Sequence, residues 1–414
     1  MTTMNNSNGS MERNEQNGLK DWKSPGQNKP KGLKINQIFS TPTVHPFDEI
    51  EWETRQAKIT GDNGEVIFEQ NDVEVPAGWS QLATKVVVSK YFYGDADAGR
   101  GQREKSVKQL VHRVCRTIAD RGQRDGYFAS QADTENFYNE LTWLCVNQYG
   151  AFNSPVWFNV GLRDVYDIKG SEHNWHWDDK QKKAVPCKSS YEYPQASACF
   201  IQSVKDTMVD IMRLATSEAM LFKHGSGTGT DLSTLRSSKE KLAGGGKPSG
   251  PLSFMRVYDQ IAAVVKSGGK TRRAAKMQSL MITHPDIKDF ICCKMEEEKK
   301  ARALIKAGYG GAFNNEAYNS VMFQNSNLSV RVTDEFMRAA ERDDIWPTYE
   351  VTSGKPSVQY KANELLDLIA EGTRFCGDPG IQYHSTINKW HTCPNTAPIN
   401  ASNPCSEYMF IDDS

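Results

Sequence analysis

The sequence predicts an α/β fold with a parallel sheet, and three observations support this prediction. Short β-branched and apolar runs, typical of buried strands, alternate with amphipathic stretches of helical periodicity. Glycine, proline, asparagine and aspartate separate the two kinds of segment. The chain has 414 residues, which is enough for roughly two or three domains. Repeated strand–helix alternation favours parallel strands, because each helix returns the chain to the same edge of the sheet.

The composition excludes several classes of protein. The net charge is −1, so no overall field favours a nucleic acid polymer as partner. No run of 18 apolar residues predicts a membrane span, and the N-terminus lacks the apolar core of a secretory signal. The nine cysteines and eight histidines are scattered, without a CxxC or HExxH spacing. We therefore expect no metal site, no disulfide framework and a cytoplasmic protein.

The N-terminal third begins with a polar stretch. Residues 1–32 are rich in Asn, Ser, Gly, Lys and Pro, and we expect them to be disordered. Residues 83–94 (ATKVVVSKYFYG) predict a strand. Residues 107–120 predict a helix, and Asp133 is the expected N-cap of the next one. These helices include two cysteines that we expect in the core, Cys115 and Cys145.

Two features follow the helices. Ser154, just before Pro155, could bind a ligand through its hydroxyl or cap a turn, and its spacing alone favours the turn. Residues 163–195 are polar and aromatic, and they predict a surface insertion.

The middle of the chain contains a glycine-rich stretch between polar residues. Residues 198–201 predict a strand in which Cys199 would be a small buried residue. Asp206 could cap the helix predicted at 208–222. The run 225–230 (GSGTGT) could bring backbone N–H groups to a phosphate, but it fits neither the Walker pattern nor the dinucleotide fingerprint.

A basic loop and further alternating elements complete this part. Residues 251–266 predict an amphipathic helix, and four cations follow within 266–273, Lys270 and Arg272 among them. These cations could bind phosphate or be solvated, and composition favours neither. The remaining predicted elements are a buried strand at 277–283, a strand at 329–332, a helix capped by Thr333 at 334–342 and a helix at 359–376.

Near the end of the chain, Asn403, Cys405 and Glu407 alternate around Pro404. If the segment is extended, as the residue before proline favours, the three side chains leave one face. An amide, a thiol and a carboxylate would then share a small volume. That set can orient a hydroxyl, move a hydrogen atom and take a proton, although a lone cysteine is more often a buried small residue.

The stretch SNPCSEYMF resembles the active-site finger loop of ribonucleotide reductases. The surrounding sequence resembles the adenosylcobalamin-dependent class II form. Further similar stretches occur in the order of the family, and the resemblance covers most of residues 33–414. They are FNSPVWFNVG (152–161), ASACFIQSV (196–204), GSGTGTDLSTLR (225–236), NLSVRVTDEFMRA (327–339) and GDPGIQYHSTIN (377–388).

The resemblance implies a ten-stranded α/β barrel with the finger loop through its centre. It divides the chain into a tail at 1–32, a class II N-terminal domain at 33–148, mainly helical, and the first part of the barrel at 149–414. The family continues beyond this point with a second redox cysteine and further strands. We therefore expect the chain to need a complementary C-terminal reductase chain, and to be inactive alone.

The resemblance also implies the chemistry, which is reduction of ribonucleotides to deoxyribonucleotides with adenosylcobalamin (vitamin B12). Its catalytic residues would be Asn403, Cys405 and Glu407, and Cys199 would be a redox cysteine. Substrate contacts would come from the catalytic Asn403 and Glu407, from Cys199, and from three further residues: Ser154, Ala198 and Gly227. A thioredoxin-type reductant would restore the cysteines.

In relatives, an allosteric deoxynucleotide or ATP binds loops at a dimer interface. The resemblance assigns this role to Asp206 and Arg236 and, on weaker grounds, to Lys270 and Arg272. It therefore implies a homodimer.

Two other functions remain open from the sequence. The chain could be a nucleotide-binding regulator without turnover, or a class I large subunit with a diiron partner. The residues of the motifs favour class II over class I. Neither diphosphate nor triphosphate substrates can be preferred from these residues.

Overall fold

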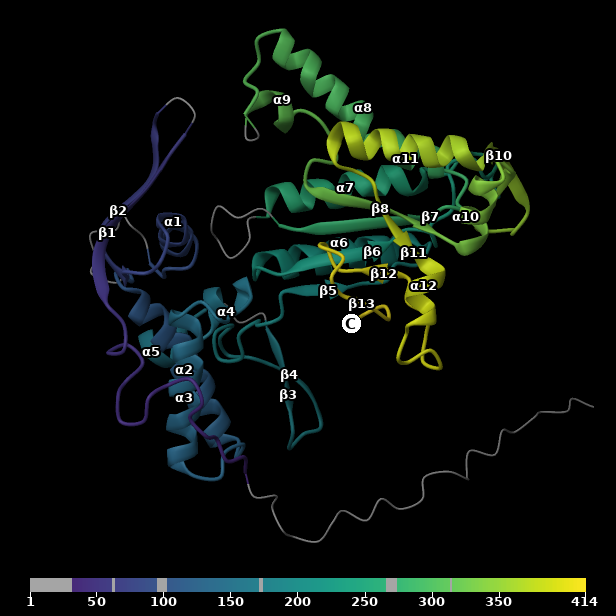
Figure 1. Ribbon diagram of the computed structural model, residues 1–414. Helices are drawn as coiled ribbons and strands as arrows, with labels where there is room; N and C mark the ends of the chain where they lie inside the picture. Colours follow the sequence, from purple (N-terminus) through teal and green to yellow (C-terminus); the bar gives the residue numbers. More distant parts are fainter. Residues whose placement is uncertain (1–31, 62–63, 95–102, 171–173, 266–273, 313–314) are drawn as a thin grey trace, which may run out of the picture.

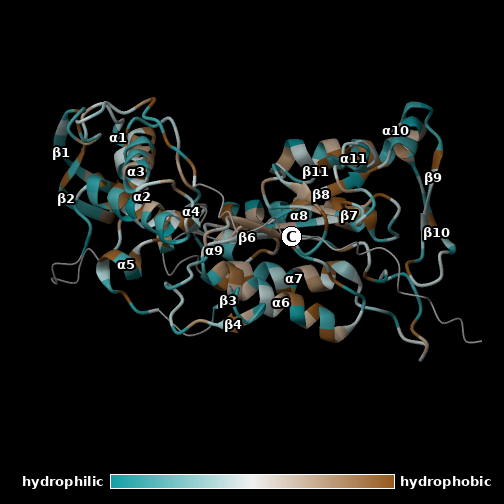
Figure 2. Cartoon of the chain, turned by 90° about the horizontal axis from the view of Figure 1, so that it is seen from below, coloured by the Kyte–Doolittle hydropathy of each residue, from teal (hydrophilic) through white to brown (hydrophobic). Residues whose placement is uncertain are grey.

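A computed structural model describes residues 32–61, 64–94, 103–170, 174–265, 274–312 and 315–414. Figures 1 and 2 place the N-terminal elements at one end of the molecule and a five-stranded sheet at the other, with α4 (Ser154–Asn159) between them. Apart from Gly32, the predicted tail lies outside the described residues. The basic loop with Lys270 and Arg272 also lies outside them.

The N-terminal part packs an antiparallel hairpin against three helices. Its core includes Val73, Val88, Leu110 and Val114, each at most 2% exposed. Cys115 and Cys145 belong to the same core, as expected. The elements are β1 (Trp52–Thr60), β2 (Val66–Pro76), α1 (Gln81–Lys90), α2 (Val107–Arg124) and α3 (Gln131–Val146).

Two predictions in this part are wrong. Residues 83–94 were predicted as a strand, but most of them lie in α1. The Ser80 side chain accepts from Ala83 N and caps the helix, and Val88 is buried in the core, so capping and packing outweigh the weak helix preference of valine. The N-cap of α3 is Ser130 rather than Asp133, whose own backbone N–H donates to the Ser130 hydroxyl.

A buried ion pair joins the N-terminal helices to the next segment. Arg113 and Glu104 are 0% and 2% exposed, and their side chains are 2.8 Å apart. The Arg113 guanidinium also donates to the carbonyl oxygens of Trp157 and Val160 at the end of α4. Beyond lie α5 (Leu162–Tyr166), β3 (Trp175–Asp178) and β4 (Lys183–Pro186). The last two form a hairpin within the predicted insertion.

The sheet confirms the predicted α/β class. Its five strands are parallel and lie in the order β11-β8-β7-β6-β5, so neighbours in space are also neighbours in the chain among these five. Short buried strands joined by helices dictate this arrangement. The strands are β5 (Cys199–Ile201), β6 (Gly227–Asp231), β7 (Lys276–Met281), β8 (Ser326–Val332) and β11 (Gly380–Tyr383).

Helices supply the main apolar core on one face of this sheet. Leu214, Tyr258, Phe290, Phe336 and Leu365 are fully buried there, one from each of five helices. Figure 2 shows hydrophobic colour on the strands that these helices cover. The helices are α6 (Met208–Lys223), α7 (Gly250–Val264), α8 (Ile287–Lys306), α10 (Asp334–Glu341) and α11 (Ala362–Cys376).

Most of these helices match their predictions. Thr333 caps α10 through Phe336 N, as expected. Helix α11 begins at Ala362, three residues later than predicted, because the preceding residues form β10 (Pro356–Lys361) in a hairpin with β9 (Ile345–Tyr349). The short elements are α9 (Glu316–Asn319), α12 (His384–Lys389), β12 (Ala401–Ser402) and β13 (Met409–Phe410).

Strand β6 shows how the sheet separates its two faces. Thr228 and Thr230 face the helices, where they bond Glu218 of α6 and Lys276 of β7 respectively. Lys276 and Glu218 form a fully buried ion pair. Gly227 and Gly229 alternate with the threonines and face the opposite side, where residues 401–404 pack. The position of residues 401–404 therefore depends on the alternation of glycine and threonine along β6.

Candidate active site

Residues 399–410 form a loop that lies on the glycine face of β6, and we call it the thiol loop. Its two arms, β12 and β13, pair antiparallel. At the tip, Ser406 N donates to the carbonyl oxygen of Asn403 at 3.1 Å, which closes a tight turn through Pro404 and Cys405. The expectation of an extended segment is therefore wrong. Asn and Pro at the first two positions of a four-residue turn favour a β-turn.

The turn nevertheless brings the predicted side chains to Cys199. Burial raises the pKa of the Cys199 thiol; a hydrogen bond with the Asn403 side chain lowers it, and the negative charges of Glu407 and Cys405 raise it further. Asn403, Glu407 and Cys405 thus each lie close enough to Cys199 to act on its thiol. Cys199 is half-buried in β5, whereas Cys405 and Glu407 are exposed. A thiol pair, an amide and a carboxylate are gathered at one end of the sheet.

The Asn403 side chain is fixed on both sides. It is 1% exposed, and its Oδ1 accepts from the backbone N–H of Tyr408 at 3.0 Å. The amide nitrogen is left to face Cys199. A buried amide with one oriented N–H₂ group can donate to a thiol or a hydroxyl oxygen placed beside it.

Glycine is required where the loop meets the sheet. A Cβ atom added to Gly229 would lie 1.7 Å from the carbonyl oxygen of Ser402, and one added to Gly227 would lie 2.8 Å from Cγ of Pro404. A backbone oxygen cannot yield as a flexible side chain can, so Gly229 sets how closely the loop approaches.

The glycine stretch does not offer its N–H groups to a phosphate, which contradicts that interpretation of 225–230. Gly225 N and Ser226 N donate to Phe222 and Leu221, and Gly227 N donates to the carbonyl oxygen of Ala198 at 2.7 Å. Thr228 N donates to Ala275. Residues 227–230 belong to β6, and the donors of 225–228 are used by the helix end and by the sheet.

Three strand residues that hold the loop were not predicted. The Gln382 amide donates to the hydroxyls of Ser402 and Ser406, at 2.7 and 3.2 Å. Arg331 donates to Gln382 Oε1 and to the carbonyl oxygen of Ile399, and Asn327 donates to that of Pro404. A signal existed, because Arg331 stands between two valines of a strand, where a charge needs partners.

Ser154 lies in a different setting from the thiol loop. Its hydroxyl is 3.1 Å from that of Tyr91, and the turn is capped by Asn153, which contradicts the capping interpretation of Ser154. The helix that carries Ser154 is tied to the segments that precede β5 and β6 by Asn159, which donates to the carbonyl oxygens of Gln195 and His224.

Asp206 and Arg236 form an ion pair at 2.5 Å, with side chains 24% and 37% exposed. Asp206 was also a candidate cap of α6, but that cap is Thr207, whose hydroxyl accepts from Asp210 N. The two predicted effector residues are therefore brought together, on a partly exposed surface.

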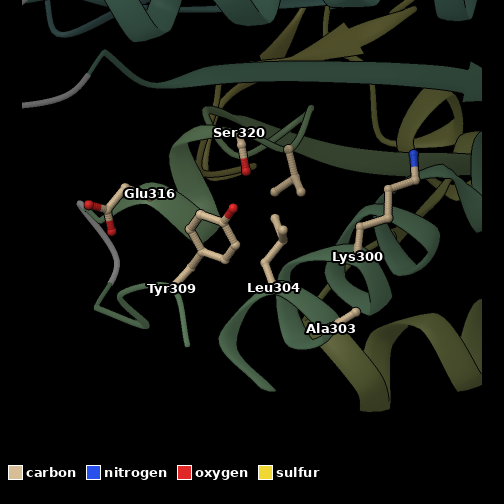
Figure 3. Close-up of a pocket in the computed structure, with 7 residues that line it drawn as sticks. Lys300, Ala303, Leu304, Tyr309, Glu316 and Ser320 are labelled. Atoms are coloured by element: carbon tan, nitrogen blue, oxygen red, sulfur yellow. The ribbon is translucent and has the colours of Figure 1, made fainter. Parts of the chain in front are cut away.

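Two cavities differ in what surrounds them. One of about 520 Å³ adjoins the thiol loop and is lined by Gln382, Ser406 and Glu407, together with aromatic residues that include Tyr383, Trp390 and Phe410. Another, of about 630 Å³, lies between α8 and α9, where Leu304, Tyr309 and Ser320 face one another (Figure 3). None of the predicted site residues that the structure describes lines the second cavity.

The described residues contain neither a candidate metal cluster nor a candidate membrane span. No group of three or more His, Cys, Asp or Glu side chains is arranged to hold a metal ion. No helix in that part of the chain combines the length and apolar character needed to cross a membrane.

Comparison with known proteins gives two family matches. Residues 197–414 match the family described as ribonucleotide reductase, barrel domain, and residues 53–148 match class II vitamin B12-dependent ribonucleotide reductase.

Individual relatives agree. A protein of Rhodopirellula baltica named vitamin B12-dependent ribonucleotide reductase is 63% identical over 387 residues, which are 92% of this chain and 37% of the relative. One of the same name from Streptomyces clavuligerus is 45% identical over 95% of this chain and 38% of its own length. The chain thus spans less than two-fifths of these relatives. It belongs to the ribonucleotide reductase family, in the class II, vitamin B12-dependent group.

Proposed function

We propose that this chain carries the reacting thiols of a ribonucleotide reductase that makes deoxyribonucleotides. The observation that supports this most is the gathering of Cys199, Asn403, Cys405 and Glu407 at one end of the parallel sheet. When bound, adenosylcobalamin supplies the radical that turns the Cys405 thiol into a thiyl radical.

The chain has a surface suited to such a cofactor. The cavity beside the thiol loop has an aromatic rim, with Tyr383, Trp390 and Phe410, against which a flat macrocycle or adenine could stack. Because the macrocycle binds its own cobalt, the lack of a metal-ligand cluster in the described residues is no obstacle.

The chain's own residues divide the reaction among them. The Cys405 thiyl removes the 3′ hydrogen of the ribose, Glu407 takes the proton of the 3′ hydroxyl, and Asn403 orients the substrate hydroxyls. Water leaves C2′. Cys199 and a second thiol of the complete enzyme supply the two electrons and two protons that form this water and the new C2′–H bond, and they become a disulfide, which a thioredoxin-type dithiol reduces. Glu407 then returns its proton to the 3′ oxygen, and Cys405 returns its hydrogen atom to C3′, which regenerates the thiyl radical. Substrate contacts at Ser154, Ala198 and Gly227 belong to the same proposal.

Regulation belongs to the Asp206–Arg236 pair. A nucleotide effector would bind Arg236 through phosphate, because a dianion competes well with a single, partly exposed carboxylate. Lys270 and Arg272 would add cations, and binding would be linked to dimerisation.

A chimera tests this function. Residues 1–414 would replace the matching 37% of the Rhodopirellula baltica relative, and reduction of ribonucleoside di- and triphosphates would be measured with adenosylcobalamin and a dithiol. We expect turnover that Cys405→Ser abolishes. An inactive chimera of a relative that is itself active, or an active Cys405→Ser chimera, would overturn the proposal.

A further inference from the structure

One residue of the thiol loop, between the thiol and the carboxylate, has an unusual backbone conformation. Ser406 stands between Cys405 and Glu407 and has a φ of +63°. That left-handed region is costly for residues with a Cβ, by roughly 1–2 kcal/mol. Because φ at Ser406 sets the direction of the chain between the thiol and the carboxylate, whatever holds this residue also sets where both groups point.

The Ser406 hydroxyl is held from the sheet. The Gln382 amide nitrogen lies 3.2 Å from this hydroxyl and 2.7 Å from that of Ser402. The Ser402 hydroxyl in turn donates to the carbonyl oxygen of Asn403 at 2.9 Å. One amide thus spans the base and the tip of the turn. Gln382 and Ser402 are buried, so water competes little for these bonds.

The orientation of the Gln382 amide is itself fixed. Arg331 lies opposite Gln382 in the parallel β8–β11 register and donates to its oxygen at 2.8 Å, which forces the N–H₂ group toward the loop. Arg331 is 0% exposed and also donates to the carbonyl oxygen of Ile399, at the start of the loop. The guanidinium can only donate, so the amide cannot turn over without facing a cation with its own donors.

We propose that Gln382, oriented by Arg331, is a positioning residue that holds Ser406 in its left-handed conformation and thereby aims Cys405 and Glu407 at the substrate. This inference rests on the proposed function for the roles of those two residues. The geometry of the hold does not depend on cofactor or substrate, so it can be measured on the chain alone.

Amide hydrogen exchange of the full 414-residue chain is the direct test. Gln382→Met keeps the length of the side chain and removes both hydrogen bonds to the loop. We expect the backbone amides of Ser406 and Tyr408, which donate to Asn403, to exchange about tenfold faster, which corresponds to one or two lost bonds. Gln324→Met is the matched control, because the Gln324 amide donates to the carbonyl oxygen of Met322, away from the loop. Unchanged exchange at both amides in folded Gln382→Met would overturn the proposal.

A second pair of variants distinguishes positioning from simple packing and avoids the buried strand. Ser406→Ala and Ser406→Gly both remove the hydroxyl, but only glycine adopts a positive φ without strain. If the hydroxyl serves to hold φ, Ser406→Ala should expose the turn to exchange several-fold more than Ser406→Gly. Equal effects, or a larger effect of glycine, would contradict the proposal.

The chimera separates this inference from the function on which it rests. Gln382→Met should lower kcat much more than it changes KM, because the substrate still binds while the thiol is misdirected. Faster loop exchange in a chimera whose wild type has no turnover would refute the function and leave the hold intact. Full kcat in Gln382→Met would refute the positioning role.

Discussion

The thiol loop and the Asp206–Arg236 pair are built in opposite ways. Three strand residues hold the loop through neutral and charge-assisted hydrogen bonds. The loop packs on the face of the sheet where two glycines of β6 leave room for it. The pair is one ion contact between two partly exposed side chains. Buried, mutually oriented bonds fix a group in place, whereas an exposed ion pair contributes about 0–1 kcal/mol and is easily exchanged.

The difference is consistent with the roles proposed for the two regions. A thiol that removes a hydrogen atom must stand at a defined place before the substrate arrives. A regulatory cation must give up one partner for another when the ligand arrives, so a strong internal bond would oppose binding. Rigid support and easy exchange thus suit the catalytic and regulatory roles that we propose.

The largest expected effect comes from the chemistry at the loop. In the chimera, Cys405→Ser should abolish turnover and exchange of the substrate 3′ hydrogen, because a hydroxyl hydrogen is far harder to abstract than a thiol hydrogen. Cys199→Ser should retain 3′ exchange but block reduction at C2′. The measurement is product formation together with isotope release from 3′-labelled substrate.

The control for these two variants is Cys115→Ser in the N-terminal core. Cys115 is 0% exposed and far from the chemistry in the sequence and the fold. It should lower stability by about 1 kcal/mol without changing the reaction. A loss of chemistry as severe as in Cys405→Ser would refute the assignment of roles.

The second prediction concerns the contact between the thiol loop and β6. Gly229→Ala places a methyl group against the carbonyl oxygen of Ser402, so the loop must shift. We expect a loss of about 3 kcal/mol in the free energy of unfolding, measured in urea, and no turnover in the chimera. Gly244→Ala is the matched control, because a Cβ there meets nothing within 4 Å. Equal stability of the two variants would show that the loop does not rest on β6.

The third prediction concerns the exchangeable pair. Arg236→Ala should weaken binding of a deoxynucleoside triphosphate by roughly 1.5–3 kcal/mol, the range for hydrogen bonds to charged groups, as measured by calorimetry. Turnover without effector should change much less. Arg342→Ala removes a comparable surface ion pair with Asp344 and should leave binding unchanged. Unaltered affinity in Arg236→Ala would remove the effector role.

Much of the fold and part of the site could be predicted from the sequence, and the predictions that failed did so for physical reasons. The α/β class and most helices follow from periodicity. Asn403, Cys405 and Glu407 act on the Cys199 thiol, and only the resemblance had placed these four residues in one site. The extended loop was wrong because Asn403-Pro404 begins a turn, and 83–94 was wrong because Ser80 caps a helix. Gln382 was missed because its role depends on the register between β8 and β11, which no local pattern encodes.

The smallest effect tests whether the charges of the loop reach Cys199. Burial is the main cause that raises the pKa of this thiol, and the charge of Glu407 adds to it, so the thiolate forms only at higher pH than in an unperturbed cysteine. Removing that charge in Glu407→Gln should lower the Cys199 pKa. Alkylation of Cys199, followed across pH by mass spectrometry of its peptide, should then reach half-maximal rate at a lower pH, because the thiolate is the nucleophile. Glu371→Gln, on the outer helix α11, supplies the control and should leave the profile of Cys199 unchanged. If Glu407→Gln left it unchanged as well, the thiol and the carboxylate would be too far apart to share one substrate.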